Sequence, residues 1–124
     1  MTDTISRYVS AWNEKTPEAV KAAFSECCAP EMTYTDKNAR TYTPDQTPII
    51  KGIEELTALV MASYAKEPGR TFSMITTPQY FDSHCHYSWG LHVPGKDTAA
   101  GWDYIRYNDE NLITEIIGFL PEQP

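Results

Sequence analysis

The sequence lacks the features that direct a protein to a membrane or to nucleic acid. No apolar run approaches the length needed to span a bilayer. Residues 1–3 do not begin a secretory signal peptide, which would have a basic region followed by an apolar one. Lys and Arg number 10 against 17 Asp and Glu, which gives a net charge of −7, and no basic block is present. We therefore expect a cytoplasmic protein with neither a membrane nor a nucleic acid as partner.

Cysteine is also scarce, and its arrangement argues against disulfide or metal chemistry. The chain has 3 cysteines, of which Cys27 and Cys28 are adjacent, and it has no Cys-x-x-Cys motif. Its 3 histidines fall in residues 84–92, where only a His-x-His pair is closely spaced and no acid completes a ligand set. We expect buried thiols in a reducing compartment and no bound metal.

Helical patterns dominate the first half of the chain. Apolar residues at positions 5, 8, 9 and 12 form one stripe, which predicts a helix over residues 2–13. Thr16-Pro17-Glu18 is a helix start, and that second helix should end before Pro30. Residues 52–66 carry a third buried stripe, which Pro68-Gly69 terminates.

Strand patterns dominate the second half. Strands are predicted over residues 70–79 and 80–93, with a break near Pro78, and over 101–107 and 112–120. A shorter strand at 32–36 precedes a polar loop, 37–48, that could rim a pocket. Helices gathered early and strands gathered late predict a single α+β domain over residues 1–124, with helices on one face of a mostly antiparallel sheet.

Two acids end up on faces that are otherwise apolar. Strand alternation places Asp103 in a row with Ile105 and Tyr107, and it places Asp36 at the end of a row with Met32 and Tyr34. A carboxyl group in such a place has a partner or a shifted pKa, and such groups concentrate at functional sites. The plainer alternatives are a structural acid at 103 and a turn former at 36.

Three segments together resemble the nuclear transport factor 2-like superfamily, in its SnoaL-like and ketosteroid isomerase-like branch. They are RYVSAWN at 7–13, Ala23-Phe24 followed by MTYTD at 32–36, and GWDYIRYN at 101–108 leading into IIGF at 116–119. The resemblance implies a cystatin-like fold, in which a curved antiparallel sheet wraps on a long helix to form a cone with an internal pocket. It also implies a homodimer, for which the outward row of Trp102, Tyr104 and Arg106 would suit an interface.

The isomerase pattern of this family maps onto three residues. It makes Asp36 the general base, Tyr8 an oxyanion donor and Asp103 an acid kept protonated to donate a hydrogen bond. For Tyr8, an ordinary core position is the alternative. Lys37 replaces the proline that usually follows the base, and a neighbouring cation would weaken it. The predicted substrate contacts are Trp12, Tyr34, Val60, Tyr64, Trp89 and Ile105.

The resemblance implies an enzyme that uses acid–base catalysis without a cofactor, an isomerase or cyclase acting on a small hydrophobic carbonyl or polyketide-like compound. A non-catalytic domain that binds a ligand or partner is one alternative. A dehydratase or an epoxide hydrolase is another. A dehydratase of this superfamily uses two pocket histidines, so a bulge near Gly90 that turned His86 inward would favour that reading.

Overall fold

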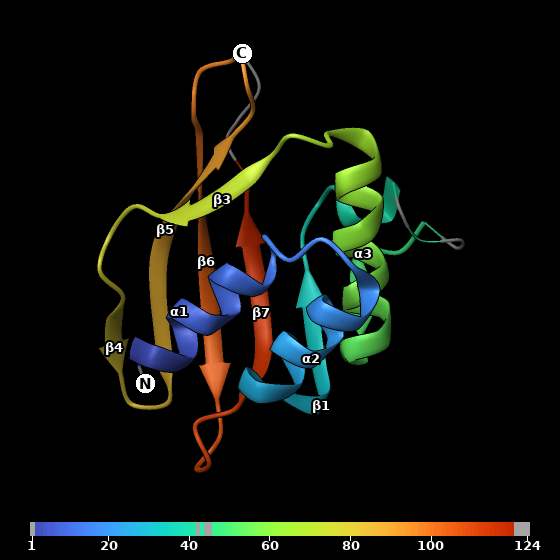
Figure 1. Cartoon of the computed structure of the whole chain (residues 1–124). Helices are drawn as coiled ribbons and strands as arrows, with labels where there is room; N and C mark the ends of the chain where they lie inside the picture. Colours follow the sequence, from blue (N-terminus) through green and yellow to red (C-terminus); the bar gives the residue numbers. More distant parts are fainter. Residues whose placement is uncertain (1, 42, 44–45, 121–124) are drawn as a thin grey trace.

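Three helices pack on a curved sheet in the computed structural model, which describes residues 2–41, 43 and 46–120 (Figure 1). Helices α1 (Thr2–Ala11) and α2 (Pro17–Cys27) lie across one face of the sheet, and α3 (Gly52–Lys66) lies beside one edge of the sheet. A short 3₁₀ helix, η1, covers Ala39–Thr41. Among the described residues, no helix is both long enough and apolar enough to cross a membrane.

The strands form one seven-stranded sheet in the order β2-β1-β7-β6-β5-β3, with β4 also paired to β5. Their bounds are Cys28–Thr35 (β1), Ile49–Lys51 (β2), Thr71–Met74 (β3), Gln79–Phe81 (β4), His84–His92 (β5), Ala99–Tyr107 (β6) and Ile113–Phe119 (β7). The α+β prediction is confirmed, with one difference. Of the described strand pairs, β1 with β7 is parallel and the others are antiparallel, so the sheet is mixed.

Local signals set the helix boundaries. The Thr16 hydroxyl accepts a hydrogen bond from the Ala19 amide at 3.2 Å, and α2 begins at Pro17 as predicted. Helix α3 has the predicted bounds, and its first residue, Gly52, has a positive φ of 82° that glycine adopts without strain. Helix α1 ends at Ala11, two residues before the predicted end, because Asn13 pairs instead with the backbone N–H and C=O of Phe72, both at 2.8 Å.

Two strand predictions need correction. Strand β1 begins at Cys28 and includes Pro30, and its register against β7 shifts between Cys28 and Thr33, where a bulge accommodates the proline. The stretch predicted as one strand over 70–79 is a strand only from Thr71 to Met74, and a second hairpin strand, β4, follows it.

The alternation of β5 and β6 matches the prediction and fixes which side chains face the helices. Cys85, Tyr87 and Trp89 are buried on the inner face, together with Asp103 and Ile105. The histidines of β5 are not part of this inner face. His86 is exposed, so the register flip that would have turned it inward does not occur.

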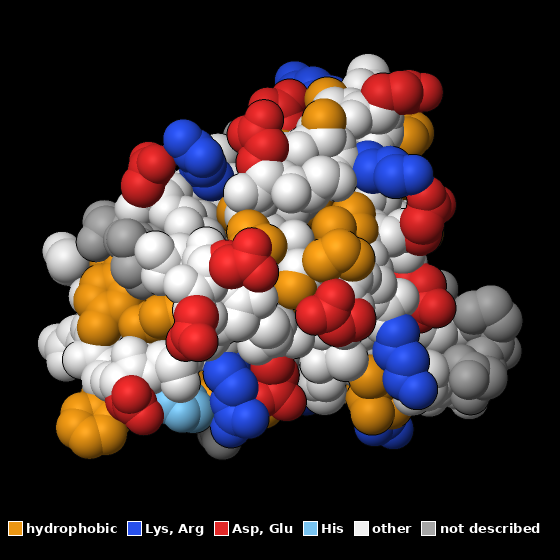
Figure 2. Space-filling model, turned by 90° about the horizontal axis from the view of Figure 1, so that it is seen from below, with side chains coloured by type: hydrophobic (Ala, Val, Ile, Leu, Met, Phe, Trp, Pro, Cys, Tyr) orange, Lys and Arg blue, Asp and Glu red, His pale blue; other side chains and the backbone are white. Residues whose placement is uncertain are grey.

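The other two histidines are bonded locally. His84 hydrogen-bonds the Tyr104 hydroxyl, and His92 bonds Ser73 and Thr98 at 2.7 and 3.0 Å. The molecular surface carries mixed charge. Figure 2, which views the molecule from below, shows acidic and basic side chains interspersed, with hydrophobic side chains in small groups between them.

Candidate functional site

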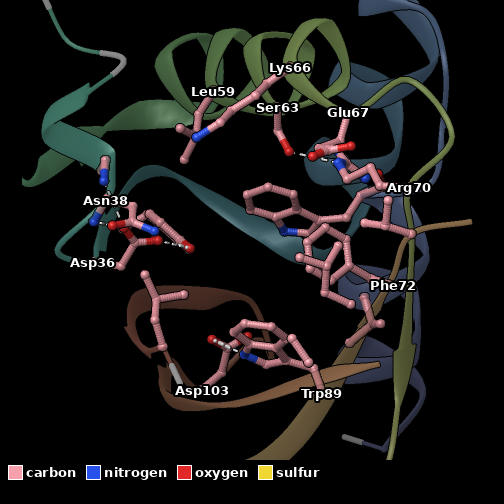
Figure 3. Close-up of a pocket in the computed structure, with 18 of the residues that line it drawn as sticks. Asp36, Asn38, Leu59, Ser63, Lys66, Glu67, Arg70, Phe72, Trp89 and Asp103 are labelled. Atoms are coloured by element: carbon pink, nitrogen blue, oxygen red, sulfur yellow. Dashed lines mark hydrogen bonds between the residues drawn. The ribbon is translucent and has the colours of Figure 1, made fainter. Parts of the chain in front are cut away.

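A cavity of about 350 Å³ lies between the inner face of the sheet, α1 and α3 (Figure 3). This volume falls in the range of small-molecule sites. Of the nine residues predicted for the site, six line the cavity: Tyr8, Trp12, Tyr34, Asp36, Trp89 and Asp103. The other three, Val60, Tyr64 and Ile105, do not, so the prediction that they contact the substrate is not supported by their positions.

Asp103 lies on the inner face of β6 with 6% of its surface exposed. The Tyr87 hydroxyl donates to its Oδ2 at 2.7 Å, and the Trp89 indole N–H donates to its Oδ1 at 3.1 Å. Burial raises the pKa of Asp103 to about 7, although these two donors act in the opposite direction, and the charge of Asp36 adds to the rise. Asp103 therefore exchanges its proton near neutral pH.

Asp36 follows β1 and is held by three donors. Its Oδ1 accepts the backbone N–H groups of Asn38 and Ala39, both at 2.7 Å, and its Oδ2 accepts the Tyr34 hydroxyl at 2.5 Å. The first two bonds build the turn into η1, so Asp36 is a turn former as well as a cavity residue. Lys37, the neighbouring cation that could pair with Asp36 and weaken it as a base, forms no ion pair with it.

Tyr8 comes from α1 and is 1% exposed. Its hydroxyl is buried and has no hydrogen-bond partner among the described residues. Burial raises the pKa of Tyr8, the charge of Asp103 raises it further, and the neighbouring Trp12 indole partly offsets both. Tyr8 thus brings an unpaired buried hydroxyl to the lining of the cavity, and leaving such a group unpaired is costly.

Gly118 on β7 lies where the two acids approach each other. A Cβ atom at this position would be 3.3 Å from the Tyr34 hydroxyl, 3.4 Å from Asp103 Oδ1 and 3.4 Å from the Asp36 Cβ. The three groups therefore surround one point next to the backbone of Gly118. The missing side chain leaves space between the Asp103 carboxyl group, the Tyr34 hydroxyl and the Cβ atom of Asp36.

Aromatic rings form a continuous wall along the cavity. Trp12 lies 5.8 Å from Tyr34 and 5.4 Å from Phe72 between ring centroids, and Phe72 lies 5.6 Å from Trp89. The two contacts of Phe72 are edge-to-face, an arrangement that aromatic pairs favour. This wall offers a flat apolar surface beside the acids, which suits a ligand with an unsaturated or cyclic carbon skeleton.

Several lining residues were not identified from the sequence. Ser63 and Lys66 from α3, Arg70 after it, and Phe72 from β3 line the side of the cavity opposite the acids, as Figure 3 shows. The aromatic and basic residue types were visible, but nothing in the sequence indicates that 70 and 72 return to α1. The described residues contain no group of three or more His, Cys, Asp and Glu side chains positioned to hold a metal ion.

Comparisons with known proteins identify the fold. No family model and no curated protein matches the sequence. Among solved structures, a "putative isomerase of the SnoaL-like family" from Agrobacterium tumefaciens is similar to this chain, with 28% identity and a TM-score of 0.81 over 97% of this chain and 96% of the other.

Two more distant structures share the fold. An NTF2-like protein of unknown function from Exiguobacterium is 15% identical with a TM-score of 0.69, over 97% of this chain and 99% of the other. A "putative polyketide cyclase" from Sinorhizobium meliloti is 13% identical with a TM-score of 0.68, over 94% and 93%. The sheet, the helices and the near-complete overlap with these proteins show that this chain has the SnoaL-like fold of the nuclear transport factor 2-like superfamily.

Proposed function

We propose that the protein catalyses proton transfer at a carbon next to a carbonyl group, as an isomerase or cyclase acting on a small hydrophobic compound in the cavity. The observation that carries this proposal is Asp103. It is a buried acid with a pKa of about 7, on a cavity wall that it shares with a second acid, Asp36, and with the unpaired hydroxyl of Tyr8. Acids with such a pKa are suited to proton transfer at neutral pH.

The three groups divide the reaction between them. Asp36 receives three hydrogen bonds and keeps room for one more proton on its carboxylate, so we assign it the role of base that removes the proton from carbon. Negative charge then develops on the carbonyl oxygen. Tyr8 and protonated Asp103 donate hydrogen bonds to that oxygen, and Asp36 returns its proton to a carbon of the enolate. No cofactor takes part in this scheme.

Deuterium exchange tests the proposal without knowledge of the natural substrate. The probe is β-tetralone in D₂O, with incorporation at the carbon next to its ketone followed by NMR. We expect wild-type protein to accelerate exchange. Asp36→Asn should remove nearly all of the acceleration, and Asp103→Asn should retain part of it because an amide still donates. Asp103→Leu should cost on the order of 2–4 kcal/mol of transition-state stabilisation.

The matched control is Asp109→Asn, which changes an exposed acid in the β6–β7 turn. Exchange should be unaffected by it. If Asp36→Asn exchanged β-tetralone as fast as wild type, the acid–base proposal would be wrong.

A binding domain without catalysis is the second candidate, and one observation favours it. The Asp36 bonds to Asn38 and Ala39 would serve the turn equally well in a protein that only binds a ligand or partner. Ligand binding by wild type without any exchange would support it. A dehydratase with pocket histidines receives no support, because none of the histidines, all of which are described, lines the cavity.

The outer face of the sheet supports a proposal about assembly. Trp102 and Phe119 are cross-strand neighbours, 51% and 54% exposed, and Tyr104 pairs with Ile117 beside them. We propose that this face packs on a second copy in a homodimer. Light scattering that gave a monomer of about 14.1 kDa at micromolar concentration would contradict it. All three cysteines are buried free thiols, which supports the proposal of a cytoplasmic location.

A further inference from the structure

A glycine lies directly opposite Trp89 in the sheet. Trp89 on β5 pairs with Gly101 on β6, and the next pair on the same face of these two strands is Tyr87 with Asp103. The Trp89 side chain therefore reaches Asp103 diagonally, past its own partner residue, which aromatic side chains are long enough to do. Figure 3 shows the indole beside Asp103, with the hydrogen bond between them.

The Trp89 ring occupies the space that a side chain at position 101 would need. A Cβ atom on Gly101 would be 2.3 Å from Cζ2 of Trp89 and 2.5 Å from its Cη2. These distances are far too short, because carbon atoms in contact are separated by about 3.5–4.0 Å. The present position of the ring thus depends on a residue without a Cβ atom at 101.

The backbone at Gly101 is held in place from two sides. A Cβ atom there would also be 2.7 Å from the backbone carbonyl oxygen of Phe119 on β7. The carbonyl oxygen of Gly101 accepts a hydrogen bond from the buried Ser88 hydroxyl at 2.9 Å, which ties this point of β6 to β5. Of the three nearest atoms that a new methyl group would meet, two belong to the Trp89 side chain and one to the backbone, so the ring is what moves.

A displaced ring loses its hydrogen bond to Asp103. The indole is rigid, and its nitrogen is only two bonds away from Cζ2, so a shift of Cζ2 by about 1 Å to relieve the contact carries the N–H group with it. The bond from Trp89 to Oδ1 of Asp103 is already 3.1 Å long. N–H···O bonds extend to about 3.2 Å, so this one cannot lengthen much further.

We propose that Gly101 is a positioning residue, which lacks a side chain so that the Trp89 indole can lie across β6 and direct its N–H group to Oδ1 of Asp103. This inference deepens the proposed function and rests on it for the role of Asp103 as a donor. Tyr87 bonds the other oxygen, Oδ2, so the two donors together fix the orientation of the carboxyl group. A group that donates to a developing enolate oxygen acts best when its orientation is fixed beforehand.

Loss of the indole bond should make Asp103 a weaker acid. The bonds from Tyr87 and Trp89 favour the ionised form and lower the pKa of Asp103, whereas burial raises it to about 7. Without the Trp89 bond the pKa should rise above this value. A merely looser structure would have the opposite effect, because water that entered beside Asp103 would hydrate the carboxylate and return the pKa toward 3.8.

NMR titration of the full chain, labelled with ¹³C at the aspartate carboxyl carbons, measures this change. The Asp103 signal is assigned by its loss in Asp103→Asn. Gly101→Ala should move the midpoint of the Asp103 titration upward by about half a pH unit or more. Trp89→Phe, which keeps a ring and removes the N–H group, should move it in the same direction. The double variant Gly101→Ala/Trp89→Phe should have the midpoint of Trp89→Phe alone, because both changes remove the same bond.

Urea unfolding of the same variants tests the steric contact. Phenylalanine lacks the Cζ2 and Cη2 atoms that meet the new methyl group, so the double variant should be more stable than Gly101→Ala. If Gly101→Ala did not fold, a folded double variant with the midpoint of Trp89→Phe would support the proposal, and an unfolded double variant would overturn it.

Gly90→Ala is the matched control. It adds a methyl group at another buried glycine on β5, where the nearest atoms belong to Ile75, Thr98 and His92. The Asp103 midpoint should be the same in Gly90→Ala as in wild type. An unchanged or lowered midpoint in Gly101→Ala would overturn the proposal, and so would a double variant in which the two upward shifts add.

The titration does not depend on catalysis, so its outcome is separable from that of the exchange experiment. If Gly101→Ala raised the midpoint while wild type exchanged no β-tetralone, the proposed catalysis would fail and Gly101 would position Trp89 in a binding site. If exchange depended on Asp36 and Asp103 while the midpoint did not rise, only the inference about Gly101 would fail.

Discussion

Replacing Asp103 by asparagine should change how protein stability depends on pH. In the folded protein the pKa of Asp103 is raised from 3.8 to about 7, chiefly by burial. In the unfolded chain the same carboxyl group ionises near its ordinary pKa. Between these two values the unfolded state releases the proton and the folded state holds it, so the wild type loses stability as pH rises through this window. Asparagine has no such proton.

The size of the effect follows from the two pKa values. Each pH unit between them lowers the wild-type free energy of unfolding by about 1.4 kcal/mol relative to the variant. Across the whole window the difference reaches roughly 4 kcal/mol. The contribution of Asp103 to stability is complete below pH 3.8 and is lost once the pH passes about 7. Asparagine has nearly the same shape as aspartate, so the rest of the structure should be the same in both proteins. The contributions of the other acids to the pH dependence of stability then cancel when the two proteins are compared.

Urea unfolding followed by tryptophan fluorescence at several pH values between 4 and 8 measures this difference. The free energy of unfolding of Asp103→Asn minus that of wild type should rise steadily and level off above pH 7. Asp109→Asn, at an exposed turn, is the control, and its free energy of unfolding should differ from that of wild type by the same amount at every pH. A difference that did not change with pH would refute the reasoning. A difference that fell with pH would mean that Tyr87 and Trp89 stabilise the ionised form by more than burial disfavours it.

Three further changes test other contacts. Tyr8→Phe should leave the melting temperature unchanged or raise stability by up to ~1 kcal/mol, because it removes an unpaired buried hydroxyl, yet it should slow β-tetralone exchange. Gly118→Ala should place a methyl group 3.3–3.4 Å from Tyr34 and Asp103, and NMR titration of the carboxyl groups should show a still higher pKa for Asp103 as water is displaced. Asn13→Ala should cost ~1–3 kcal/mol in urea unfolding by removing two bonds to β3, and Asn13→Asp should recover only the bond to the Phe72 amide.

The features predicted well from the sequence are those that repeat locally. The three helices and the inward faces of β5 and β6 follow from apolar spacing, capping residues and strand alternation, each read within one segment. Alternation also placed Asp103 on the inner face with Ile105. The parallel pairing of β1 with β7 was not predicted, because these strands are far apart in the sequence and no local pattern records which of them become neighbours.

The difference between the predicted substrate contacts and the residues that line the cavity arises from rotation about α3 and position along β6. Helix α3 turns Leu59, Ser63 and Lys66 toward the cavity, at the spacing of one helical face. Val60 and Tyr64 each lie one residue later, about 100° further around the helix. Val60 is fully buried, and Tyr64 packs against Arg70 instead of lining the cavity. Apolar spacing located the buried stripe but could not show where the sheet stops covering it.

Ile105 illustrates the same limit on a strand. It shares the inner face with Asp103, one pleat further along β6, and it is fully buried. Alternation shows which face a side chain occupies, but not how far the cavity extends along that face. Arg70 was missed for a different reason. It bonds to Trp12, 58 residues earlier in the chain, and such a contact has no local signature.

The two acids of the cavity have opposite surroundings, and that contrast supports their assigned roles. Both oxygens of Asp36 accept hydrogen bonds, and two of its three donors are backbone N–H groups, a setting suited to a carboxylate. Asp103 is more deeply buried and receives only two side-chain donors, so burial outweighs hydrogen bonding and its pKa rises to about 7. A pair of equivalent acids would share one proton between them. The hydrogen bonds around Asp36 suit a negative charge, and the burial of Asp103 favours its protonated form. The proposed reaction needs both, because a base removes the proton from carbon and a donor stabilises the enolate oxygen.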